Sequence, residues 1–125
     1  MGLDNGIILI SKEKKVPMWL AELRDEKQIK YSLCHWRRCR NIRYEVRTKI
    51  FGLSFRDNKN NYLIAEDLNK IIDILKSFNA KNWEHEWMEW RYMKPILRRD
   101  IRILRKVRKW LTKHKDYTLY FYDSF

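Results

Sequence analysis

The feature that most constrains the fold is a long periodic segment, residues 95–114, near the end of the chain. Proline fixes φ near the helical value and lacks the N–H that a first helical residue leaves unbonded, so we expect a helix to begin at Pro95. At about 100° per residue, one side of this helix is apolar: Ile96, Leu97, Ile103, Leu104, Val107, Trp110 and Leu111. The other side is basic: Arg98, Arg99, Arg102, Arg105, Lys106, Lys109 and Lys113. One side should pack in a core, and the other should meet solvent or an anionic partner.

The other predicted elements place strands at both ends of the chain and helices in the middle. The predicted strands are Gly6–Ser11, Ile29–His35 and a third that begins at Tyr117. The predicted helices are Met18–Arg24, Trp36–Phe51, Glu66–Phe78 and a short tryptophan-rich helix before Pro95. Residues 54–62 are polar and rich in asparagine, which predicts a loop. We therefore expect one α+β domain over residues 1–125, with a two- to three-stranded sheet of the N- and C-terminal strands and an inner strand, packed against three to four helices.

Composition indicates a soluble chain that folds on its own. The 125 residues are 45% hydrophobic and include six tryptophans, enough for a single core. The longest apolar run, Gly6–Ile10, is far shorter than the roughly 20 residues of a membrane span. Cys34 and Cys39 are the two cysteines, and no secretion-signal pattern opens the chain. We expect a cytoplasmic protein with free thiols.

The net charge of +12 is concentrated in two segments. Residues 35–51 hold six basic residues and one acidic residue, and residues 95–114 hold eight and one. Arginine forks match phosphate geometry, so the sequence predicts a basic two-helix surface that binds DNA or RNA non-specifically. Its residues would be Arg37, Arg38, Arg40, Arg98, Arg99, Arg102, Arg105, Lys106, Lys109 and Lys113. The competing interpretation is a solvated face whose charges are partly paired with acidic neighbours.

Three tryptophans before Pro95 support a different function. Trp83, Trp87 and Trp90 recur at the spacing of one helical stripe. Such a stripe is typical of a core or of an interface with a second copy or a host protein, although tryptophans also stack on unpaired bases. The alternative function is therefore a protein-interaction or oligomerisation module whose basic faces are only solvated.

Asp100 is the one acidic residue within the predicted basic helix, and it projects into the apolar side. A carboxylate at such a position must be paired or protonated. We expect a structural ion pair with Arg43 or Arg47 of the other basic helix. On that hypothesis, replacing Asp100 with asparagine lowers stability by about 1–3 kcal/mol.

Residues that could bind a metal do not have the required spacing. Cys34, His35 and Cys39 lack the paired spacing of a zinc site. His85 begins a sequence similar to the HExxH motif of zinc proteases, but Glu89 stands where the second histidine belongs. We expect no metal and no cofactor.

Two aspartates at opposite ends of the chain are the remaining candidates for catalysis. If the terminal strands are neighbours, Asp4 and Asp123 could approach each other and form a polar cluster with Tyr122 or His35. Aspartates beside turns more often bind backbone N–H groups. We therefore assign no catalytic residues and expect a non-enzymatic protein.

Four segments resemble a known group of proteins. MGLDNGI at the start, CHWRRCRNIR in the middle, NAKNW before the tryptophans and YFYDSF at the end are similar to segments of small proteins from bacteriophages and from prophage regions of Gram-positive bacteria. The resemblance implies a viral or mobile-element accessory protein. It implies no activity, because none is assigned to that group.

Overall fold

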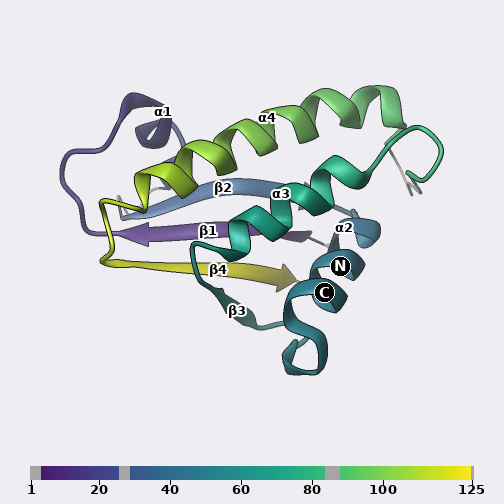
Figure 1. The fold of residues 1–125 in the computed structure, drawn as a ribbon, viewed down its shortest axis with the longest axis horizontal. Helices are drawn as coiled ribbons and strands as arrows, with labels where there is room; N and C mark the ends of the chain where they lie inside the picture. Colours follow the sequence, from purple (N-terminus) through teal and green to yellow (C-terminus); the bar gives the residue numbers. More distant parts are fainter. Residues whose placement is uncertain (1–3, 26–28, 84–87, 125) are drawn as a thin grey trace.

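The computed structural model describes residues 4–25, 29–83 and 88–124, and in them a four-stranded antiparallel sheet carries helices on one face (Figure 1). The strands are β1 (Asp4–Ser11), β2 (Lys30–Arg37), β3 (Asn60–Leu63) and β4 (Tyr117–Ser124). The α-helices are α1 (Met18–Ala21), α2 (Arg40–Val46), α3 (Asp67–Ser77) and α4 (Trp90–Trp110). A π-helical turn (Arg47–Phe51) and a 3₁₀ turn (Gly52–Ser54) extend α2. The predicted α+β class is confirmed, whereas the predicted two to three strands are too few.

The two ends of the chain form the centre of the sheet. The strand order is β2-β1-β4-β3, and each neighbouring pair is antiparallel. Ile7 in the middle of β1 pairs with Cys34 of β2 on one side and with Phe121 of β4 on the other. The N- and C-terminal strands therefore share one sheet, as predicted, and they are neighbours in it.

Side chains alternate between a helix-covered face and an open face of the sheet. On the covered face Ile7, Leu9, Leu119 and Phe121 are at most 1% exposed. Their neighbours along the strands point the other way, and Tyr62 of β3 is 70% exposed there. In Figure 1, α3 and α4 lie in front of the sheet. The apolar sides of these helices therefore close one core over the covered face.

Strand β3 was predicted as part of a loop, which is wrong. Residues Asn60–Leu63 begin with two asparagines, which are depleted in strands, so the local strand signal is weak. They form a strand because β4 offers an unpaired edge: Asn61 pairs with Phe121 and Leu63 pairs with Leu119. Buried Asn61 also bonds the backbone of Arg56 and Lys59, which closes the turn before the strand.

Trp36 was predicted to begin a helix, which is wrong, because it belongs to strand β2. Its side chain is 1% exposed on the covered face, and Cys34, two residues earlier, is buried as well. Arg38 then adopts a φ of 56°, which separates the strand from α2. The predicted helix over Trp36–Phe51 therefore begins only at Arg40.

Helix α4 begins five residues before the predicted first residue, Pro95. Trp90 is its first residue, and Pro95 lies just beyond the first turn. A proline there cannot donate to the Arg91 carbonyl. Both residues are exposed, so solvent can satisfy that carbonyl. The longer helix brings Lys94 onto the same surface as the predicted cations.

Candidate nucleic-acid interface

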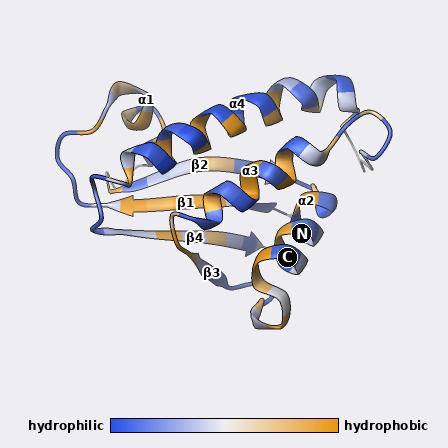
Figure 2. Cartoon of the chain, viewed as in Figure 1, coloured by the Kyte–Doolittle hydropathy of each residue, from blue (hydrophilic) through white to orange (hydrophobic). Residues whose placement is uncertain are grey.

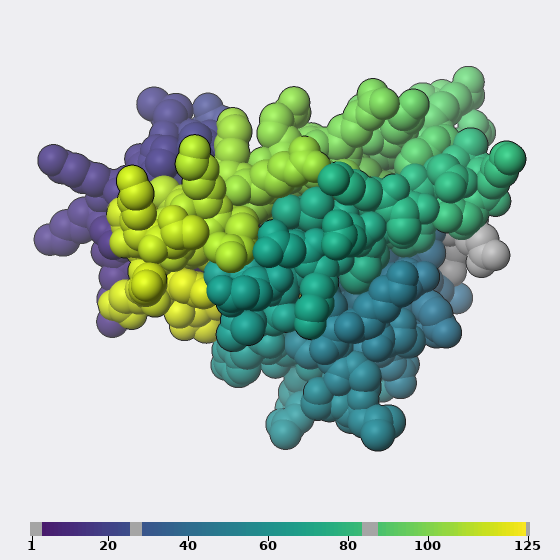
Figure 3. Space-filling view, in the orientation of Figure 1, coloured from purple at the N-terminus to yellow at the C-terminus, as the bar shows by residue number. Residues whose placement is uncertain are grey.

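Helix α4 has one buried side and one cationic side, as its sequence predicts. Its buried residues are Met93, Leu97, Asp100, Leu104 and Val107. The predicted cations are exposed: Arg98, Arg99, Arg102, Arg105, Lys106, Lys109 and, just beyond the helix end, Lys113. We call these seven residues the α4 ridge. Figure 2 shows the hydrophilic and hydrophobic residues alternating around α4, and Figure 3 shows its side chains projecting along the upper edge of the molecule.

Among residues 4–25, 29–83 and 88–124, no acidic side chain neutralises the α4 ridge. Helix α4 holds nine lysines and arginines and one acidic residue, Asp100, which is buried beneath the ridge. Within the described residues, no carboxylate lies within 4.0 Å of a ridge nitrogen. The ion pairs that α4 does form involve flanking cations: Arg91 with Glu89 at 3.0 Å and Arg108 with Glu66 at 3.8 Å. The ridge therefore presents positive charge to solvent.

This arrangement opposes the stability of the helix. Ridge cations recur three or four residues apart, as in Arg98 to Arg102 and Arg105 to Lys109. Like charges at these spacings destabilise a helix by about 0.2–0.5 kcal/mol per pair. Such a stripe is poorly explained by folding alone and well suited to an anionic partner.

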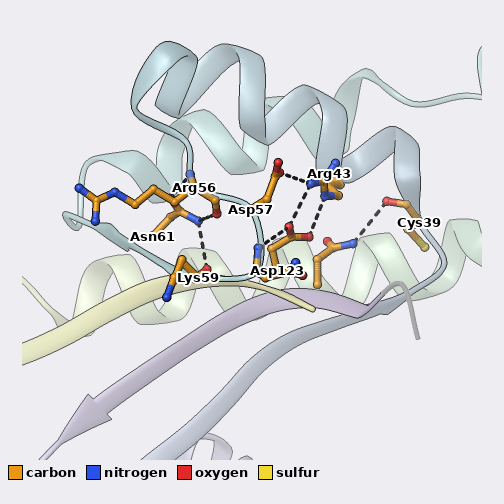
Figure 4. Close-up of polar contacts among 9 residues, drawn as sticks. Cys39, Arg43, Arg56, Asp57, Lys59, Asn61 and Asp123 are labelled. Carbon is orange, nitrogen blue, oxygen red and sulfur yellow. Dashed lines mark hydrogen bonds and ion pairs between the residues drawn. The ribbon is translucent and has the colours of Figure 1, made fainter. Parts of the chain in front are cut away.

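The arginine of α2 that points toward the sheet has a structural role instead. Arg43 Nε and Nη2 donate to the two carboxylate oxygens of Asp123 at 2.7 and 3.0 Å, and Nη2 also donates to Asp57 at 2.6 Å (Figure 4). The Asp123 side chain is only 2% exposed. Hydrogen bonding to Asp123 is the main cause that raises the pKa of Arg43. This contact ties α2 to the end of β4 and leaves Arg43 unsuited to bind a ligand.

The other predicted cations lie apart from the α4 ridge. Arg37, Arg38 and Arg40 are exposed where β2 passes into α2. A small apolar pocket lies between this group and the first turns of α4, with Trp36, Met93 and Ile96 among its lining residues.

Helix α3 divides the two basic helices. It packs against both α2 and α4 and lies between them in Figure 1. Its exposed charges are of both signs, with Asp73 between Lys70 and Lys76. Between α2 and α4, α3 therefore presents charges of both signs, while the seven ridge cations all come from α4 and the residues just after it.

The expected ion pair of Asp100 with Arg43 or Arg47 is wrong. Asp100 is 2% exposed, and its Oδ2 accepts a hydrogen bond from Trp36 Nε1 at 2.9 Å. Arg43 is held by Asp123 and Asp57, and the Arg47 guanidinium lies over the Phe55 ring. The error follows from placing Trp36 on a helix with Arg43, because Trp36 is on the strand beneath α4.

Burial is the main cause that raises the pKa of Asp100 to about 6, against the opposing hydrogen bond from Trp36. Burial, followed by the charge of Asp100, also raises the pKa of the Cys34 thiol. A buried thiol with a raised pKa is a poor nucleophile. We therefore assign Asp100 and Cys34 a structural role.

Asp4 and Asp123 lie on neighbouring strands but do not form a joint site. Asp123 is on the covered face with Arg43, whereas Asp4 alternates onto the open face. On that face His35 Nδ1 and the Tyr122 hydroxyl are hydrogen-bonded. Burial, followed by the charge of Asp4, raises the pKa of Tyr122. Asp4 and Asp123 therefore do not form the pair of facing carboxylates that glycoside hydrolysis uses.

Two of the three predicted tryptophans contribute to the core. Trp83 is 7% exposed, packs edge-on against Phe78 and donates a hydrogen bond from Nε1 to the Met88 carbonyl. Trp90 packs against Trp83 at a ring separation of 5.9 Å. Trp87, like His85, lies outside the described residues. Of the two described tryptophans, Trp83 is therefore buried in the core and Trp90 is partly buried against it.

The sequence interpretation missed two cations, Lys94 and Lys76, beside the ridge. Lys94 was omitted because the helix was predicted to start after it, although its spacing of four residues from Arg98 was the available signal. Lys76 is on α3, and only the packing of α3 against α4 brings it near the ridge.

In comparisons with known proteins, no family model, no curated protein and no solved structure matches this chain. In the described part of the chain, no cluster of three or more histidine, cysteine, aspartate or glutamate side chains could hold a metal ion. None of the helices described there is both long enough and apolar enough to cross a membrane.

Proposed function

We propose that this protein binds nucleic acid through the phosphate backbone, without strong sequence preference, and that the α4 ridge is the binding surface. The supporting observation is the row of exposed cations on one helix with no carboxylate within 4.0 Å among the described residues. At about 1.5 Å per residue, the ridge from Arg98 to Lys109 is about 16 Å long. That length spans several phosphates of a DNA or RNA strand.

A sequence-tolerant mode of binding suits these residues. Arginine and lysine on one exposed helix face contact phosphates readily. Helix α4 as a whole contains no asparagine or glutamine, the side chains that read adenine edges. A location in the cytoplasm and a phage or prophage setting belong to the same proposal; the setting has only the resemblance of the four sequence segments in its favour.

The proposal is tested with a triple variant of the ridge, Arg102→Gln, Lys106→Gln and Lys109→Gln. Binding to a mixed-sequence duplex at 0.1 M salt should weaken about 100-fold, because three phosphate contacts are lost. The matched control is Lys12→Gln, Lys14→Gln and Lys15→Gln, which removes the same charge from an exposed loop. Equal weakening in both variants would mean that net charge, and not the ridge, drives binding.

A second candidate, self-association, is favoured by the open face of the sheet. Tyr62 is 70% exposed there and meets Tyr120 edge-on at a ring separation of 6.3 Å. Exposed aromatic residues are enriched at interfaces. Sedimentation at two protein concentrations tests this candidate, since a monomer at both excludes it.

A further inference from the structure

The cations of α4 form two rows that face different surroundings. Lys94, Arg98 and Arg105 line a groove between α3 and α4, and Lys76 faces them from α3. Arg102, Lys106 and Lys109 do not line this groove and form the outer row. Figure 3 shows α3 (teal) lying beside α4 (green) on this face of the molecule. One helix thus presents two different chemical surfaces.

The groove combines an apolar floor with a cationic rim. Its floor consists of Leu75, Phe78, Trp90, Leu97 and Ile101. In the part of the chain that the structure describes, its four charged lining residues are all basic and no carboxylate lines it. The volume of about 370 Å³ lies in the range of small-ligand sites. The groove therefore favours a ligand that is anionic on one side and flat and apolar on the other.

We propose that this groove holds unpaired bases of a single-stranded nucleic acid, whose phosphates lie along Lys94, Arg98 and Arg105. This inference rests on the proposed function and narrows its ligand. A duplex stacks its bases inside and offers phosphates alone, for which the outer row suffices. An unpaired nucleotide also offers a π face, which binds aromatic and arginine side chains with little regard to sequence.

The first test compares the two rows. The groove-row variant is Lys94→Gln, Arg98→Gln and Arg105→Gln; the outer-row variant is Arg102→Gln, Lys106→Gln and Lys109→Gln. The probes are labelled 12-mers of oligo-dT and oligo-U, and a 12-base-pair duplex. We expect the groove-row variant to weaken single-strand binding at least about tenfold more than the outer-row variant does. The difference should vanish or reverse for the duplex.

The second test changes the floor without changing charge. Ile101→Gln places a polar group in the groove, and Ile103→Gln makes the same change at a partly buried position on the same helix that does not line the groove. We expect Ile101→Gln to weaken oligo-dT binding about fivefold to tenfold and duplex binding less than twofold. Ile103→Gln should change neither. Thermal unfolding of each variant checks that it folds, and the row variants change only exposed residues.

Several outcomes would overturn the inference. Equal losses for single strand and duplex in every variant would mean that α4 binds phosphate alone, which refutes the groove and leaves the proposed function intact. Competition by a polyglutamate 12-mer as strong as by oligo-dT would mean that the groove takes an acidic peptide. Absence of binding to any nucleic acid by the wild type would refute the proposed function itself.

Discussion

Helix α4 and the segment from Arg37 to Arg47 are both rich in basic residues, but their cations differ in their contacts with acidic side chains. The seven cations of the α4 ridge have no carboxylate within 4.0 Å among the described residues, whereas Arg91 and Arg108 of the same helix are ion-paired, and the one acid of the helix is buried beneath the ridge. In α2, Arg43 turns inward and is held by Asp123 and Asp57. The cause of this difference lies outside both segments, because the aspartate that binds Arg43 is Asp123 at the end of β4. A basic helix therefore indicates an anionic partner only after its acidic neighbours in space are known.

The contrast between the two helices predicts the largest loss of stability for a variant of the Arg43–Asp123 pair. Arg43→Ala leaves a carboxylate that is 2% exposed without its guanidinium, and loss of one partner of a buried pair costs about 3–5 kcal/mol. We expect a loss of about 3 kcal/mol in the free energy of unfolding, measured by urea denaturation. Nucleic-acid affinity should be unchanged, provided that it is measured where the variant is folded.

The control for this pair is Asp57→Asn. The Asp57 side chain is 58% exposed, so its loss should cost less than about 1 kcal/mol. If both variants lose the same small amount, Arg43 is a surface residue like those of the ridge and the contrast between the helices disappears.

Asp100 is a second point of contrast with Arg43, because no cationic side chain among the described residues is ion-paired with it and Arg99 acts on it only through its charge. Its pKa of about 6 lies above the ordinary value near 4. Between these values the folded protein holds more protons than the unfolded chain, so Asp100 makes stability fall as pH rises through that window. A difference of about two pKa units corresponds to about 3 kcal/mol.

Asp100→Asn removes the buried charge and retains an oxygen to accept from Trp36 Nε1. We expect this variant to be more stable than the wild type by about 2 kcal/mol at pH 8 and to lose that advantage at pH 4. Chemical denaturation at both pH values measures it, with the exposed Asp73→Asn as control. A loss of stability at pH 8 would contradict this expectation and would mean that the folded protein stabilises the Asp100 carboxylate.

The smallest effect on stability is expected for substitutions in the α4 ridge. Arg102→Gln, Lys106→Gln and Lys109→Gln together remove several like-charge pairs, each worth about 0.2–0.5 kcal/mol. We expect the unfolding free energy to rise slightly, by no more than about 1 kcal/mol, while nucleic-acid binding is strongly weakened. The contact of Lys106 with the Trp19 ring contributes about 0.5–1 kcal/mol, so a larger loss of stability would show that these cations have further structural partners.

The sequence predicted the elements whose signal is local. The α4 periodicity, the terminal strands and the helix at Glu66–Phe78 are all present within a few residues, because each has an apolar pattern of its own. Strand β3 was missed because its pairing with β4 defines it, and that contact is long-range.

The part of the candidate site that depends on local periodicity was predicted, and the part that depends on contacts between elements was not. The exposed residues of the ridge follow from the helical wheel of α4. The partner of Asp100 does not, because Trp36 lies 64 residues earlier on another element. The groove also does not follow from the helical wheel, because Lys76 comes from α3 and only the packing of the two helices brings it near Lys94.

The salt dependence of binding to a mixed-sequence nucleic acid tests the central claim most directly. If the α4 ridge contacts about five to seven phosphates, the logarithm of the association constant should fall with the logarithm of salt concentration at a slope of about −4 to −6. The ridge triple variant should reduce that slope by about three. A slope near zero, or one that the triple variant leaves unchanged, would contradict the account.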